Sequence, residues 1–254
     1  MSAVGLELVR AGMAPYWKLM AESCGGGVWE RRGVTAAVIP AAADRSVFNS
    51  VLYRSPDELL ASLHELAEVY ADAGVNAWTV WVPESENETS AGLEAVGHKL
   101  DATPRAMAMS VEELREPPAS EEIEIEERLD LAELARLNEV AYGYPPGDFD
   151  PLANSVLPGF HLHFAHLDGK AVSCAGIWDH GSDGVLSWVA TLPEARGRGI
   201  SARLCAHALA EARGRGALTS TLQATRLGYP VYARLGYRDV GVLQMWERRR
   251  PEAQ

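Results

Sequence analysis

The residues best suited to chemistry in this 254-residue chain are two glycines interleaved with two arginines, Arg196-Gly-Arg-Gly199. An apolar stretch at 185–191 predicts a strand before them, and apolar periodicity over 199–213 predicts a helix after them. A helix start offers unpaired backbone N–H groups and the positive end of the helix dipole. This order of strand, glycine-rich turn and helix favours an anion site, and so a nucleotide-derived cofactor bound through its pyrophosphate.

Two comparisons within the sequence narrow this hypothesis. The same four letters recur at Arg213-Gly-Arg-Gly216, but after a helix, where Gly214 is predicted to end the helix. The first copy also fits the dinucleotide-binding fingerprint, which needs its glycines directly after a strand and an acidic residue about 20 positions later. Pro193-Glu-Ala intervenes here, and the next predicted strand ends at Gln223 with no carboxylate near it. The dinucleotide interpretation is therefore disfavoured.

The elements that must position this motif fall into two halves. Two prolines among charged and small residues predict a linker at 115–121, between domains at 1–114 and 122–254. Each half mixes antiparallel strands with crossover helices, so the expected fold class is α/β with mixed sheets, as two related units in tandem, each a mostly antiparallel sheet flanked by helices. The predicted helices are 6–23, 56–74, 87–96, 131–140, 199–213 and 226–234, and the predicted strands are 33–39, 46–53, 77–82, 104–110, 122–126, 161–167, 171–178, 185–191, 217–222 and 238–247.

Composition excludes several classes of protein. A formal net charge of −12 argues against a general nucleic-acid or anionic-membrane binder. No apolar run approaches the roughly 18 residues of a membrane span, and the first residues lack the features of a secretion signal. Cys24, Cys174 and Cys205 are widely spaced, as expected for buried thiols in a reducing cytosol. We therefore expect a cytoplasmic protein, bacterial by its arginine- and alanine-rich composition, without nucleic-acid or membrane partners; a homodimer is left open.

The motif residues resemble a known family. Arg196-Gly-Arg-Gly-Ile-Ser201 is similar to the Arg/Gln-x-x-Gly-x-Gly/Ala signature of the GCN5-related N-acetyltransferase (GNAT) superfamily. Thr191-Leu-Pro193 stands where that family commonly has Val-x-Pro, and Tyr232 with Gly236-Tyr237 matches its later Leu-Tyr-x-x-x-Gly-Phe/Tyr segment. The resemblance covers about residues 121–248. It departs from the family at Ser201, where Gly or Ala is usual, and at Thr225, where many members carry an Asn that contacts the cofactor.

The resemblance implies a co-substrate and a mechanism. Acetyl-CoA would donate its acetyl group to a small-molecule or peptide amine by direct attack in a ternary complex, with no metal. Tyr232 would be the general acid that protonates the coenzyme A thiolate. Strand backbone would pair with the pantetheine arm, turn amides would hold the pyrophosphate, and an arginine would add charge. The implied cofactor-binding residues are Val189, Ala190, Thr191, Arg196, Gly197, Arg198, Gly199, Ile200, Ser201 and Thr225.

Other side chains with useful chemistry are less specific. The general base is not identified, and the candidates are Glu139, Tyr142, Asp179 and His180, each of which also fits a solvated surface position. His161, His163 and His166 partly alternate on one predicted strand. Only the first two share a face and no third ligand is evident, so no metal site is expected.

The amino-terminal half carries no equivalent motif. The stretch after its strand 77–82, Pro83–Glu88, is acidic and glycine-free and would repel a pyrophosphate. Residues 93–98 nevertheless resemble a degenerate form of the segment around Gly236-Tyr237. We expect a degenerate GNAT-like domain without cofactor in this half. The leading hypothesis for the whole chain is an acyl-CoA-dependent N-acyltransferase, and the alternative is a non-catalytic acyl-CoA-binding sensor or assembly module; the acidic net charge favours a cationic amine as acceptor.

Overall fold

The structure, a computed structural model, describes residues 2–118 and 122–250. The chain divides into two compact units, each assembled from two stretches of sequence. The carboxyl-terminal unit consists of the residues up to Gly12 together with Arg105–Val240. The amino-terminal unit consists of Met13–Pro104 together with the chain from Gly241 on.

This division differs from the boundary predicted at 115–121, of which residues 119–121 lie outside the described part. β6 (Arg105–Ser110) precedes that segment but pairs with β11 (Thr219–Ala224) of the carboxyl-terminal unit over six antiparallel residue pairs. The later part of β12 (Arg238–Arg249) pairs with β4 (Ala77–Pro83) of the amino-terminal unit. Each half of the sequence therefore supplies a strand to the other half's sheet, because backbone hydrogen bonds decide where a strand belongs.

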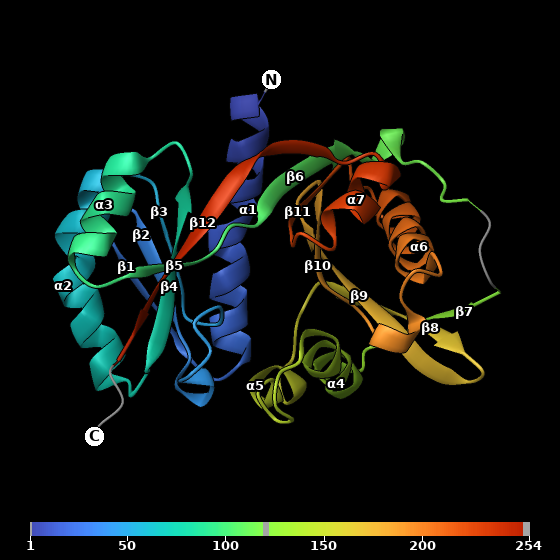
Figure 1. Cartoon of the computed structure of the whole chain (residues 1–254), viewed down its shortest axis with the longest axis horizontal. Helices are drawn as coiled ribbons and strands as arrows, with labels where there is room; N and C mark the ends of the chain where they lie inside the picture. Colours follow the sequence, from blue (N-terminus) through green and yellow to red (C-terminus); the bar gives the residue numbers. More distant parts are fainter. Residues whose placement is uncertain (1, 119–121, 251–254) are drawn as a thin grey trace. The chain divides into compact units, whose positions relative to one another are not determined.

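The amino-terminal unit is a mixed sheet with helices packed on it (Figure 1). Its remaining elements are β1 (Gly27–Arg31), β2 (Val34–Val38), β3 (Ser50–Tyr53), β5 (Lys99–Ala102), α2 (Pro56–Asp72) and α3 (Asn87–Ala95), and α1 (Ser2–Ser23) ends in this unit. β1, β2 and β3 form an antiparallel meander, β3 runs parallel to β4, and β12 pairs with both β4 and β5. Ser55 caps α2 as its sequence predicts, accepting the Glu58 N–H at 3.5 Å. Strands β1 and β5 were not predicted.

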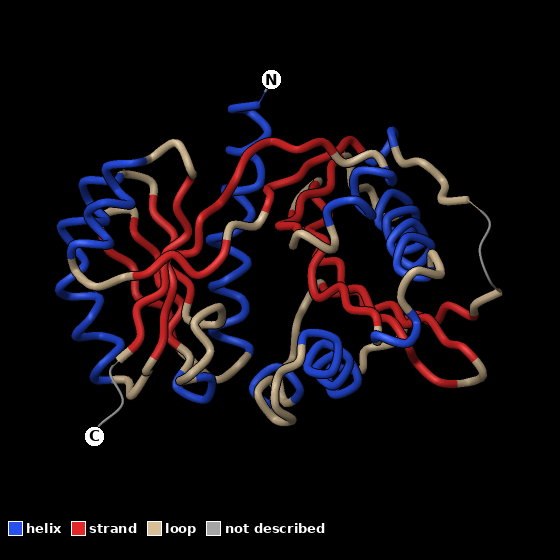
Figure 2. Tube along the Cα trace, viewed as in Figure 1, coloured by secondary structure: helices blue, strands red, loops and turns tan. Residues whose placement is uncertain are grey.

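The carboxyl-terminal unit contains a second mixed sheet, in the strand order β7-β8-β9-β10-β11-β6 (Figure 2). Its further strands are β7 (Glu124–Glu127), β8 (Phe160–Leu167), β9 (Lys170–His180) and β10 (Asp183–Thr191), and its helices are α4 (Leu131–Tyr142), α5 (Asp150–Ala153), α6 (Ile200–Gly214) and α7 (Tyr229–Leu235). Neighbouring strands are antiparallel except β10 and β11, which run parallel. Asp168 and Gly169 form the predicted β8–β9 hairpin turn, with φ of 49° and 73°.

Helices α4 and α6 cover opposite faces of this sheet. Cys174 of β9 accepts a hydrogen bond from Asn138 of α4. Three residues further along β9, Ile177 faces α6, because a Cβ added to Gly184 would contact both Ile177 and Ala212 of α6. Successive strand residues point to opposite faces, so this odd separation places the two helices on opposite sides.

The two units share one connectivity. In each, an antiparallel meander ends in a strand that runs parallel to the next one, and a long helix joins the two: β3, α2 and β4 in one unit, β10, α6 and β11 in the other. The strand beyond this pair is antiparallel and comes from the other half of the sequence. The predicted fold class, two similar α/β units with mostly antiparallel sheets and flanking helices, is confirmed. In the part of the chain that the structure describes, no helix is both long and apolar enough to cross a membrane.

His98 is a buried titratable group in the amino-terminal unit. Its side chain is 1% exposed and its ring edge packs on Trp78, with centroids 4.6 Å apart. Neither ring nitrogen has a hydrogen-bond partner among the described residues. Burial, helped by the nearby Arg248 charge, lowers the pKa of His98 to about 4.

We predict that this pKa makes stability fall in mild acid. An unfolded histidine titrates near pH 6.5, so between pH 6.5 and 4 the unfolded chain binds more protons than the folded one and the free energy of unfolding decreases as pH falls. The loss reaches up to about 3 kcal/mol, at 1.36 kcal/mol per pKa unit. Urea unfolding at several pH values measures it. The variant His98→Leu should lose this part of the pH dependence and the exposed-site control His64→Gln should keep it; equal profiles for His98→Leu and the wild type would contradict the prediction.

Candidate functional site

The main feature of the carboxyl-terminal unit is a pair of parallel strands that separate. β10 and β11 pair only from Asp183 to Val185, opposite Thr219 to Thr221. At this closed end the Asp183 carboxylate accepts hydrogen bonds from the Thr219 and Thr221 hydroxyls, at 2.7 and 2.6 Å. β10 continues to Thr191, and within the described residues no further pairing joins it to β11. The edge of β10 from 186 to 191 therefore has no pairing with β11, and we call this unjoined stretch between the two strands the open seam.

A bulge shapes β10 along this seam. The register with β9 shifts between Ser187 and Ala190, and Trp188 adopts a φ of 52°. The Trp188 carbonyl accepts hydrogen bonds from the Asn138 amide and the Cys174 thiol, each at 3.4 Å. A non-glycine residue at positive φ costs about 1–3 kcal/mol and persists only when its surroundings hold it. Asn138 and Cys174 supply that support.

Sequence reasoning missed Asn138. Its only signal was a polar residue on the apolar stripe of a predicted helix, one turn after Leu134, and its side chain is 2% exposed. Because buried polar groups are almost always hydrogen-bonded, such a position indicates a specific partner without naming it.

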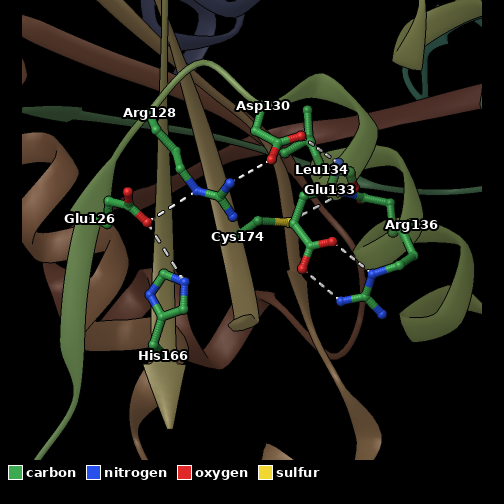
Figure 3. A network of polar contacts seen from close by, with 9 residues as sticks. Glu126, Arg128, Asp130, Glu133, Leu134, Arg136, His166 and Cys174 are labelled. Atoms are coloured by element: carbon green, nitrogen blue, oxygen red, sulfur yellow. Dashed lines mark hydrogen bonds and ion pairs between the residues drawn. The ribbon is translucent and has the colours of Figure 1, made fainter. Parts of the chain in front are cut away.

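A polar network fixes the start of α4, the helix that carries Asn138 (Figure 3). The Arg128 guanidinium lies between two carboxylates, 3.0 Å from Glu126 and 2.5 Å from Asp130. The Asp130 carboxylate also accepts the Glu133 N–H at 2.9 Å, so it caps the helix as predicted. Through Arg128, the network therefore ties the start of α4 to Glu126 on β7.

The predicted anion-binding turn lies at the end of β10. Gly197 and Gly199 have φ of 75° and 76°, the left-handed region that explains glycine at both positions. Gly199 caps α6 without a side-chain cap hydrogen bond, and the first turn of the helix holds no acid. Ile200 is buried, so its contribution is its backbone N–H, and the Ser201 hydroxyl hydrogen-bonds to Cys205. The N–H groups of this helix start remain available to an anion.

The carbonyl groups of the predicted strand residues are engaged. Tyr142 of α4 donates its hydroxyl to the Val189 carbonyl at 2.8 Å. Ser173 donates to the Ala190 carbonyl at 2.8 Å, and its hydroxyl also hydrogen-bonds to that of Thr191 at 2.8 Å. Side chains of β9 and α4 thus hold the backbone of β10.

Arg196 binds backbone rather than reaching outward. Its guanidinium donates to the carbonyls of Thr191, at 3.1 Å, and Ala141, at 2.5 Å. It therefore ties the end of β10 to the end of α4, while its positive charge stays beside the turn. Of the two predicted arginines, the structure gives this one a positioning role.

Tyr232 lies on α7, the helix that follows β11 in the sequence. Its side chain is 8% exposed, and its ring packs edge-on against Tyr237, with centroids 5.9 Å apart. The Tyr237 hydroxyl hydrogen-bonds to Ser220 of β11 at 2.6 Å, which fixes the neighbouring ring. Burial raises the pKa of Tyr232 well above that of a free phenol, so its hydroxyl keeps its proton at neutral pH. A Cβ on Gly228 would lie 2.8 Å from the Tyr232 ring, so this glycine leaves room for it.

Thr225 has a structural contact. Its hydroxyl accepts the Gly228 N–H at 3.1 Å, and its carbonyl accepts the Tyr229 N–H at 2.9 Å. It therefore shapes the turn that leads into α7.

The candidate bases are held by structural partners. Glu139 is 7% exposed and accepts the N–H groups of Gly147 and Phe149 at 2.9 and 2.8 Å, so it organises the loop after α4. Asp179 is bound by both nitrogens of Arg215, at 2.7 and 3.1 Å.

His180, the remaining candidate, stacks on Trp178, with ring centroids 4.7 Å apart. Arg215 itself belongs to the second Arg-Gly-Arg-Gly segment. α6 ends at Gly214, and Gly216 takes the positive φ of 107° that terminates it. The predicted structural role of this second segment is confirmed.

The equivalent turn in the amino-terminal unit differs from the predicted one. The shared connectivity makes the start of α2, after β3, the counterpart of the start of α6, rather than Pro83–Glu88 after β4. At α2 the Ser55 side chain occupies the helix start, Pro56 removes one N–H, and Asp57 and Glu58 add negative charge. This helix start satisfies its own N–H groups and disfavours an anion.

The site's sequence matches a known family. Residues 158–239 match the model of the acetyltransferase (GNAT) domain, and they include β8 to β11, α6 and Tyr232. The matched residues lie within the carboxyl-terminal unit. The search of curated proteins found no match.

Solved GNAT structures share the fold of both units. A GCN5-related N-acetyltransferase from Kribbella flavida is 17% identical, with 94% of each chain covered and a TM-score of 0.68. One from Sphaerobacter thermophilus is 21% identical, covering 87% of this chain and 78% of its own, with a TM-score of 0.61. A tandem GNAT protein from the clavulanic acid biosynthesis pathway is 12% identical, with 76% and 70% covered and a TM-score of 0.54. At these identities the likeness concerns the fold.

We predict that Asn138 stabilises the bulge of this GNAT domain. Asn138→Leu keeps the side-chain size but removes the donor to the Trp188 carbonyl, which should lower the free energy of unfolding by about 1–3 kcal/mol in urea titrations. Asn154→Leu is the matched control, because Asn154 makes the same bond to the carbonyl four residues before it, at 2.9 Å, from an exposed position. It should change stability by less than about 0.5 kcal/mol. Equal losses in both variants would show that the bulge contact adds nothing.

Proposed function

We propose that the chain is an N-acetyltransferase that transfers an acetyl group from acetyl-CoA to a primary amine. One observation carries the proposal: the chain leads from the open seam of β10 through the glycine turn at 197–199 to the start of α6, which has no side-chain cap and no acid in its first turn. An extended ligand with amides in its middle and a pyrophosphate at its end fits this sequence of features. The GNAT match over 158–239 covers both features.

The proposed binding mode uses the edge of β10 and the start of α6. The edge of β10 from 186 to 191, along which no pairing with β11 is described, is the proposed path of the pantetheine arm. The N–H groups from Arg198 to Ser201 receive the pyrophosphate, at the positive end of the α6 dipole. The space beside Gly197 is open, since a Cβ placed there would meet nothing within 4 Å.

The proposed transfer step needs one proton donor. The amine nitrogen attacks the thioester carbonyl carbon, the carbon–sulfur bond breaks, and the sulfur leaves as a thiolate. Tyr232 gives its hydroxyl proton to that thiolate and recovers one from solvent, and the amine loses its extra proton to solvent. The burial that raises the pKa of Tyr232 also raises the basicity of a thiolate formed beside it, so the two remain matched.

The amino-terminal unit is proposed to bind no acetyl-CoA. The start of α2 is occupied by Ser55 and Pro56 and carries Asp57 and Glu58 in its first turn. A pyrophosphate would meet negative charge and few free N–H groups there. The stoichiometry is therefore one acetyl-CoA per chain, which isothermal titration calorimetry measures directly.

A carboxylate placed at the start of α6 should compete with the pyrophosphate. Ser201→Asp is expected to weaken acetyl-CoA binding about tenfold or more, which is about 1.4 kcal/mol, while leaving stability equal or higher because the helix dipole favours the charge. Ala210→Asp adds the same charge at an exposed position later in α6 and should bind like the wild type. Calorimetry and thermal unfolding measure the two effects separately. Unchanged affinity in Ser201→Asp would place the pyrophosphate elsewhere.

Removing the Tyr232 hydroxyl tests the catalytic step. Tyr232→Phe should lower turnover of an acetylated amine by about 10²–10⁴-fold, the usual contribution of a general acid, with the KM for acetyl-CoA unchanged. Gly228→Ala keeps the hydroxyl but displaces the ring, and it should also lower turnover. A thiol-release assay across a panel that includes cationic amines measures both.

The same assay separates the two hypotheses for the chain. Full turnover in Tyr232→Phe would remove Tyr232 from the mechanism. If acetyl-CoA raises the melting temperature of the wild type but no amine is acetylated, the chain is a non-catalytic acyl-CoA-binding module.

A further inference from the structure

Three side chains with metal-ligating atoms meet between β8 and α6 of the carboxyl-terminal unit. His163 lies on β8, and His207 and Glu211 lie one turn apart on α6. The His163 Nε2 atom is 2.6 Å from one Glu211 oxygen, and the His207 Nε2 atom is 3.3 Å from the other. One ligand atom from each residue lies within 4.8 Å of the others.

The burial of these side chains is graded from the sheet outward. His163 is 0% exposed and is held in place by the sheet, whereas the side chains of His207 and Glu211 are 43% and 36% exposed. An ion from solvent can therefore reach the two helix residues and meet the fixed imidazole behind them. Burial lowers the pKa of His163, so its ring is neutral near pH 7, the form that binds metals.

We propose that His163, His207 and Glu211 form a binding site for a divalent transition-metal ion of the zinc type. Two imidazole nitrogens and one carboxylate suit Zn²⁺ or Co²⁺, whereas Mg²⁺ and Ca²⁺ prefer oxygen ligands alone. Three protein ligands leave one position of a tetrahedral ion for water, on the exposed side. The residues are separate from the seam and from Tyr232, so the ion braces α6 against β8 and takes no part in acetyl transfer.

The sequence alone did not indicate this site. The strand histidines were considered together, but His161 binds Glu127 at 2.7 Å and His166 lies 3.7 Å from Glu126. Of the three, only His163 is grouped with His207 and Glu211. Its two partners are four residues apart on a helix far along the chain, and the packing of that helix on the sheet brings them together.

The test uses the untagged full chain, freed of metal with a chelator. We expect one equivalent of Zn²⁺ to bind and to raise the melting temperature, Co²⁺ to develop visible absorption in the same stoichiometry, and Mg²⁺ to do neither. His207→Gln, at an exposed position that tolerates substitution, should weaken Zn²⁺ binding at least about tenfold and abolish the thermal shift.

A matched control is present in α2. His64 and Glu68 form the same one-turn pair, 3.4 Å apart, on an exposed helix face, with no third ligand among the described residues. His64→Gln should bind Zn²⁺ like the wild type. The proposal is overturned if His207→Gln binds Zn²⁺ like the wild type, if His64→Gln weakens binding equally, or if Zn²⁺ affects the wild type no more than Mg²⁺ does.

Discussion

Three residue pairs of parallel backbone pairing join β10 to β11, and the carboxyl-terminal unit is organised around the point where that pairing stops. Asp183 closes one end by accepting two threonine hydroxyls. Beyond this end, any backbone N–H or C=O group of β10 that is buried from water costs free energy if it has no hydrogen-bond partner. Tyr142, Ser173 and Arg196 bind carbonyl groups of β10, so the strand is rigid although one edge is unpaired.

The same backbone plan gives opposite electrostatics in the two units. Both place a long helix after the first strand of a parallel pair. At α6 two glycines in the left-handed region replace a capping side chain, and no acid follows in the first turn. At α2 a serine, a proline and two acids close the helix start. The few residues at the helix start therefore decide whether the common fold attracts or repels an anion.

Sequence reasoning succeeded where the physics is local. The roles of Gly197, Gly199 and Asp130 follow from backbone dihedral preferences and helix capping, which involve neighbouring residues. The bulge at Trp188 depends on Asn138, fifty residues away in sequence, and only packing brings the two together. The exchange of β6 and β12 was missed for the same reason. The hydrophobic periodicity of a strand predicts that it is a strand but does not identify the strand with which it pairs.

That exchange has a consequence for how the protein is made. The amino-terminal sheet is complete only when the later part of β12 pairs with β4 and β5, and β12 follows the strands of the other unit in the sequence. A nascent chain therefore holds an exposed edge on β4 throughout the synthesis of the other unit. Cutting the gene at the proline-containing segment would separate both units from a strand they need, so neither half is a natural fragment for expression.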